Sequence, residues 1–133
     1  MDEQAIESLL NSLEEREDGE WGELPAQLLG VSLSIKIGPV GQIKHLLIEL
    51  AREILPHLDQ IVASAEAGFR EYFEEVDETV PVPYRPRIWI NEDSVLDDGP
   101  KRWALVVEVE KNPDFGIHIE FDGTEFLEVW SGD

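Results

Sequence analysis

The strongest constraint on the fold is the alternation of apolar and polar residues between Arg102 and Trp130. Three segments of this run alternate, and turn-forming residues separate them: Asn-Pro-Asp at 112–114 and Asp-Gly-Thr at 122–124. Alternation with a period of two is typical of a strand that has one buried face and one exposed face. The run therefore predicts an antiparallel three-stranded meander near the C-terminal end of the chain.

The first of these breaks sets the register between the first two strands of the meander. A loop at 112–114 places Val107 opposite Ile119 on the buried face, because residues two apart along a strand share a face. The same loop places Glu108 beside His118 on the polar face.

The second break allows two registers for the third strand. A loop at 122–124 sets Glu128 on the polar face, on the other side of His118. A two-residue Asp-Gly turn is a common hairpin signal, but it would turn Glu128 into the core. Because an unpaired buried carboxylate is costly, we expect the longer loop.

Upstream of the meander, apolar residues recur at helical spacing in three segments and alternate in another. We expect helices at 2–17, at 42–55 and from Pro56 to about Val76, strands at 31–37 and 88–90, a loop at 19–30 and a proline-rich connector at 80–87. These elements predict an α+β fold, with helices packed on one face of a four- to five-stranded, mostly antiparallel sheet that ends in the meander.

Length and composition indicate one domain, residues 1–133. We expect this domain to lie in the cytoplasm. Residues 1–23 hold nine acids and one base, so we expect an acidic helical arm at the periphery. The acidic N-terminus does not resemble a secretory signal, and no apolar run approaches the length of a membrane helix. The lack of cysteine excludes thiol catalysis and thiolate metal sites.

The net charge of −20 restricts the partners of the chain. Such a field repels nucleic acid and anionic membranes, whereas it attracts basic proteins and divalent cations. Adaptation to high salt or a simple role in solubility is the alternative. Acids also gather where the third predicted helix ends, and there they oppose the helix dipole. This conflict predicts either a frayed end or a bound cation at Glu71, Glu74, Glu75, Asp77 and Glu78.

In the expected register, Glu108, His118 and Glu128 form a row on the polar face of the meander. Two carboxylates and an imidazole could bind a divalent metal, the only cofactor that the residues suggest, or prepare the histidine for proton transfer. Ordinary cross-strand pairing of these side chains is the alternative. No serine lies in a nucleophile motif, and we assign no catalytic residue.

The same polar face offers a candidate surface for a protein partner. Apolar and aromatic groups ringed by charge are typical of a protein interface, unless helices cover this face as well. The residues concerned are Val106, Glu108, Glu120, Phe126, Glu128 and Trp130.

These observations favour a non-enzymatic protein whose acidic surface binds a basic protein. In size, acidity and lack of cysteine the chain is similar to many bacterial proteins that neutralise a basic toxin, so we expect an immunity or inhibitor role. The first alternative is a metal-binding module or metal-dependent hydrolase that uses the row of Glu108, His118 and Glu128. The second is an accessory domain whose charge serves solubility only.

Overall fold

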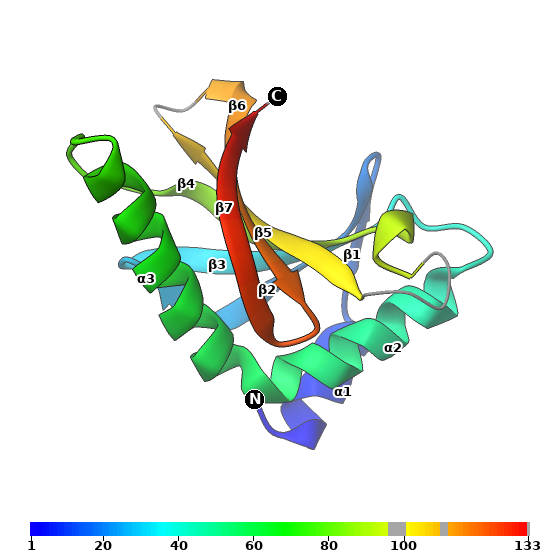
Figure 1. The fold of residues 1–133 in the computed structure, drawn as a ribbon. Coiled ribbons are helices and arrows are strands. Elements are labelled where there is room, and N and C mark those ends of the chain that lie inside the picture. The colour runs from blue at the N-terminus through cyan, green and yellow to red at the C-terminus, as the bar shows by residue number, and fades with distance from the viewer. Residues whose placement is uncertain (96–100, 110–111, 133) are drawn as a thin grey trace.

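The computed structural model describes residues 1–95, 101–109 and 112–132. It confirms the α+β class: the sheet has seven strands and is mostly antiparallel, so the expected count of four to five was too low (Figure 1). The strands lie across the sheet in the order of the chain. They are β1 Glu14–Arg16, β2 Gly19–Leu28, β3 Val31–Ile37, β4 Tyr84–Ile90, β5 Arg102–Val109, β6 Asn112–Asp122 and β7 Glu125–Gly132.

Strands β3 and β4, the one parallel pair among the described strands, explain where two of the helices lie in the chain. Parallel neighbours need a long crossover, and here α2 (Lys44–Ile54) and α3 (Leu58–Glu75) supply it. A 3-10 turn, Leu55–His57, contains Pro56 and separates the two helices. The predicted helices at 42–55 and from Pro56 to about Val76 match these bounds closely.

A single apolar core joins the helices to one face of the sheet. Alternate residues of the strands, such as Ile35 and Val107, are fully buried and belong to the same cluster as Ile54 and Phe69 of the helices. We call the opposite face of the sheet the outer face. The outer face carries the strand side chains that alternate with the buried ones, such as Trp130, which keeps 38% of its surface exposed.

The N-terminal quarter of the chain differs from the prediction. Helix α1 (Glu3–Asn11) contributes Ile6 to the core, but it ends six residues before the expected position. The chain then forms the β1–β2 hairpin, in which Arg16 pairs with Gly19, so the predicted loop at 19–30 was wrong. A side chain at Gly19 would place its Cβ 2.8 Å from the Ile37 carbonyl oxygen, and the glycine permits this close approach.

The remaining helical elements complete the inventory of the described chain. A second 3-10 turn, Glu92–Ser94, follows β4, and a capping box between Asn91 and Ser94 closes its first turn. No helix in the described part of the chain is long and apolar enough to cross a membrane.

Candidate protein-interaction surface

The first hairpin of the meander has the predicted faces but a different register. Val107 lies opposite Ile117, and Val106 lies opposite His118, each two residues from the expected pairing. Strand β6 already begins at Asn112, so the predicted loop at 112–114 was wrong. A shift of two residues leaves every side chain on its original face. Alternation therefore could not distinguish the two registers.

The second hairpin turns more tightly than expected. Asp122 pairs with Glu125, which leaves a two-residue turn in place of the predicted three-residue loop. A β-bulge at Leu127 then restores the alternation, because Phe121 pairs with Phe126 whereas Glu120 pairs with Glu128. Glu128 thus remains on the outer face despite the shorter turn.

The expected metal-binding row does not form. On the outer face His118 lies between Val106 and Trp130, whereas Glu108 pairs with Gly116. Glu108 is 3% exposed, and its Oε2 accepts from Arg87 Nη1 at 3.3 Å and lies 3.7 Å from Arg85 Nε. Its charge is therefore balanced within the chain. The described residues contain no group of three histidines or acids that could hold a metal ion.

His118 forms an aromatic stack instead of a metal site. Its ring lies parallel to the Trp130 indole, within 5°, with the ring centres 4.0 Å apart. Trp130 Nε1 donates to Glu120 Oε1 at 2.8 Å and so fixes the indole. Burial lowers the pKa of His118; Glu120 opposes this shift, and Arg87 adds to it. This shift favours the uncharged imidazole.

Three of the predicted partner-binding residues are withdrawn from the outer surface: Glu108, which is 3% exposed, and also Phe126 and Val106. Phe126 turns inward against α3: a Cβ built at Gly68 would lie 2.7 Å from the Phe126 ring. Val106 is on the outer face but only 4% exposed. Glu128 and Trp130 are both exposed there, so this part of the predicted surface remains a candidate.

The C-terminal end of α3 carries the exposed acids that the sequence pointed to, and backbone hydrogen bonds close it. Asp77 adopts a left-handed conformation with φ 57°. The Asp77 N–H donates to the Glu74 carbonyl, and the Glu78 N–H donates to the Phe73 carbonyl at 2.9 Å. These two bonds form a Schellman motif, which closes the helix end.

These acids have no counter-charge within the described part of the chain. All five are exposed, and none takes part in an ion pair with a described residue. Other surface acids do have basic partners: Glu7 is 2.8 Å from Arg52, and Glu53 is 2.7 Å from Lys101. Five negative charges are therefore concentrated at the end of α3 without an ion pair to a described residue.

Helix α3 contacts β7, the last strand of the sheet, and its C-terminal end lies away from the strand in Figure 1. Tyr72 OH donates to Ser131 Oγ at 2.9 Å and links the two elements. Two exposed apolar groups accompany the acids, because Val76 is 52% exposed and Trp130 is 38% exposed. We call these two surfaces together the acidic corner: on the helix side of β7 it consists of Glu71, Glu74, Glu75, Val76, Asp77 and Glu78, and on the outer face it consists of Glu128 and Trp130.

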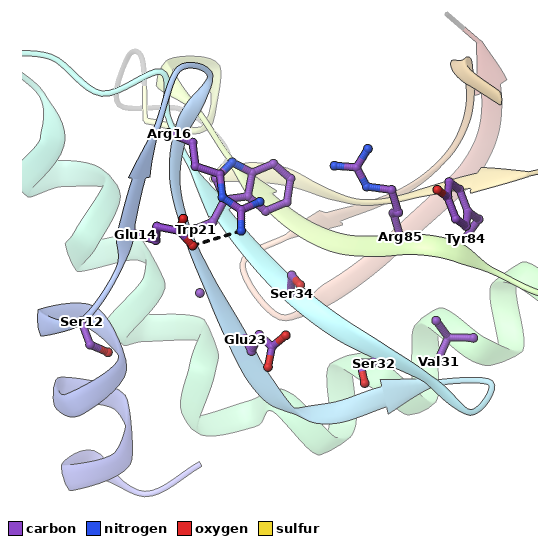
Figure 2. A pocket seen from close by; sticks show the side chains of 11 residues that line it. Ser12, Glu14, Arg16, Trp21, Glu23, Val31, Ser32, Ser34, Tyr84 and Arg85 are labelled. Carbon is purple, nitrogen blue, oxygen red and sulfur yellow. Dashed lines mark hydrogen bonds and ion pairs between the residues drawn. The ribbon is translucent and has the colours of Figure 1, made fainter. Parts of the chain in front are cut away.

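A groove of about 580 Å³ on the outer face is the other surface feature of note. Figure 2 shows Arg16 lying across the Trp21 ring, 5.1 Å from its centre, and paired with Glu14. The groove is also lined by Glu23 and Arg85, so its formal charges cancel. Trp21 was not predicted as a surface-site residue, because the segment 19–30 was expected to be a loop and not a strand. Its balanced charge makes the groove a poorer match for a basic partner than the acidic corner.

Comparisons with known proteins add no further constraint on function. No family model matches the chain, and no curated protein or solved structure matches it either. The geometry and the charges of the described residues are therefore the basis for the functional proposal.

Proposed function

We propose that the chain is a non-enzymatic interaction protein of the cytoplasm that binds a basic protein through its acidic corner. The observation that carries this proposal is the set of five exposed acids at the end of α3, which have no basic partner among the described residues. Neutralisation of a toxic basic protein is the specific role that we propose for this binding.

The acids at this position oppose the stability of their own helix. A carboxylate in the last turn meets the negative end of the helix dipole, which costs about 0.3–1 kcal/mol for each charge. Glu71 and Glu75 are four residues apart on α3, and like charges at this spacing repel each other. A cationic partner would offset these unfavourable interactions with attractive ones, so the arrangement is better suited to a complex than to the free chain.

The acidic corner also offers apolar area of the kind that protein interfaces use. Val76 projects among the acids of α3, and Trp130 projects beside Glu128. Interfaces commonly place a few such anchors inside a polar rim, and tryptophan is one of the residues most often found at their centres. Trp130 can also receive a lysine or arginine against its ring, since indole is the best cation–π acceptor among side chains.

The test is affinity capture from the native lysate with three versions of the full chain. The first is the wild type. The second, which we call the α3 variant, carries amides at the five acids at the end of α3, which are Glu71, Glu74, Glu75, Asp77 and Glu78. The third is a matched control with the same net charge, in which amides replace five exposed acids elsewhere. The control positions are Glu15, Glu17, Glu23, Glu92 and Asp93.

The proposal predicts that the wild type and the control capture the same basic protein, whereas the α3 variant does not. Capture should weaken between about 0.1 M and about 1 M salt, where the Debye length falls from roughly 10 Å to 3 Å. Equal capture by all three versions would contradict the assignment of the site. If no basic protein is recovered even at low salt, the charge serves solubility. For the toxin-neutralising role, the recovered protein should inhibit growth when expressed alone, and co-expression of the wild type should restore growth.

A further inference from the structure

We propose that the basic partner docks as an extended segment that pairs with the free edge of β7 and adds an eighth strand to the sheet. This inference rests on the proposed function, because it specifies how a basic protein would occupy the acidic corner. The geometry of the last strand, its flanking charges and its lack of protection each support it.

Strand β7 ends the order of the sheet and pairs with β6 along one edge only. No described strand pairs with its other edge. It is eight residues long, whereas β1 at the opposite end of the sheet has three residues. An edge strand of this length presents unpaired backbone N–H and C=O groups to an incoming chain, and addition of a strand is a recurring mode of peptide recognition.

The sequence of β7 lacks several of the usual devices that prevent edge pairing. It contains no proline and no lysine, and its one β-bulge lies at Leu127, before the segment Glu128–Gly132. Helix α3 meets β7 through the inner-face side chains of Phe126 and Val129, which pack against Gly68. The helix therefore packs on the face of the strand.

The charges on both sides of this edge specify the chemistry of the incoming strand. A strand added here would direct alternate side chains to the two faces of the sheet. Side chains of the added strand that point to the inner face would face the C-terminal part of α3, where Tyr72 donates a hydrogen bond to Ser131. Those that point to the outer face would face Glu128 and the Trp130 indole. Since both sides are acidic, the segment that fits best has lysine or arginine directed to both faces.

The probe for the test is a synthetic peptide of about ten residues in which adjacent lysine pairs, which direct one lysine to each face of a strand, are separated by threonine and valine, which favour strands. A control peptide has the same number of lysines but alanine and leucine between them, which favour a helix. Two further versions of the extended peptide carry N-methyl groups on alternate backbone nitrogens, one version for each of the two phases. Binding of the labelled peptides to the full chain is measured by fluorescence anisotropy.

Strand addition predicts that the extended peptide binds at least about tenfold more tightly than the helical control. It also predicts that only one N-methylated phase loses about tenfold or more in affinity, because alternate residues of an edge strand direct their N–H groups towards the partner. Equal affinities for the two phases, or no binding of the extended peptide, would overturn the inference.

The α3 variant with five amides separates this inference from the proposed function. If every basic peptide binds the wild type equally and binds the α3 variant weakly, strand addition is wrong while the acidic corner remains the binding surface. If the α3 variant binds every peptide as the wild type does, the acidic corner itself is wrong, and the inference falls with it.

Discussion

Replacement of Asp77 offers a direct test of the idea that the end of α3 is acidic at the expense of stability. Asp77 occupies the position of a Schellman motif where glycine is the preferred residue, and it does so with φ 57°. Its carboxylate also lies at the negative end of the helix dipole. Both features predict that removal of this aspartate stabilises the chain.

The size of the effect can be divided between charge and backbone. Asp77→Asn removes the charge and keeps a side chain that tolerates the left-handed region, so we expect about 0.3–1 kcal/mol of stabilisation. Asp77→Gly also relieves the left-handed strain of about 1 kcal/mol, although the greater freedom of glycine in the unfolded chain offsets part of this gain. The glycine variant should therefore be more stable than the asparagine variant, and roughly 1–1.5 kcal/mol more stable than the wild type.

Urea unfolding at low salt and at high salt measures both contributions. The stabilisation by Asp77→Asn should shrink at high salt, because salt screens an exposed charge, whereas the backbone part of Asp77→Gly should persist. Both variants should bind the basic partner equally and more weakly than the wild type, because each removes the same charge. A glycine variant less stable than the wild type, or an asparagine variant unchanged at low salt, would refute this reasoning.

Three further predictions concern the outer face and the core. Because burial lowers the pKa of His118, the imidazole is protonated in the unfolded chain before it is protonated in the folded chain as pH falls through about 6.5. The wild type should therefore lose stability relative to His118→Gln as pH falls through this range. Trp130 emission should titrate below about pH 6.5. Arg87→Ala should destabilise the chain by about 3 kcal/mol in urea unfolding, because Glu108 would remain buried with only the guanidinium of Arg85, 3.7 Å away, as its partner. Gly68→Ala should destabilise by about 1–2 kcal/mol in the same assay, because its Cβ would lie 2.7 Å from an aromatic ring of β7, and a gain in stability would contradict the packing.

Long periodic segments were predicted well because their pattern recurs several times. The alternation in Val31–Ile37 matches β3, and the helical spacing before and after Pro56 matches α2 and α3. Strand β2 was missed because Pro25 and a shift of register between Glu23 and Gln27 interrupt its alternation. Local pattern thus identifies regular elements and fails where a strand is irregular.

Contacts between distant segments could not be obtained from local pattern. The predicted register was wrong by two residues, because the alternation of a strand is the same after a shift of two. In the actual register Glu108 does not lie beside His118, so the expected row does not form. The pairing of Glu108 with Arg85 and Arg87 depends on β4 lying next to β5, which the alternation does not encode. By contrast, the unusual acids at the end of α3 were visible in the sequence, because their conflict with the helix dipole is a local property.

The affinity of the recovered basic protein for two purified variants tests the central claim most directly. Titration calorimetry would compare the chain that carries amides at the five acids of α3 with the matched control of equal net charge. If each lost contact at the rim contributes about 0.2–1 kcal/mol, the α3 variant should bind at least about fivefold more weakly than the control. Equal affinities for the two variants would show that only the total charge matters, and would contradict the assignment of the acidic corner.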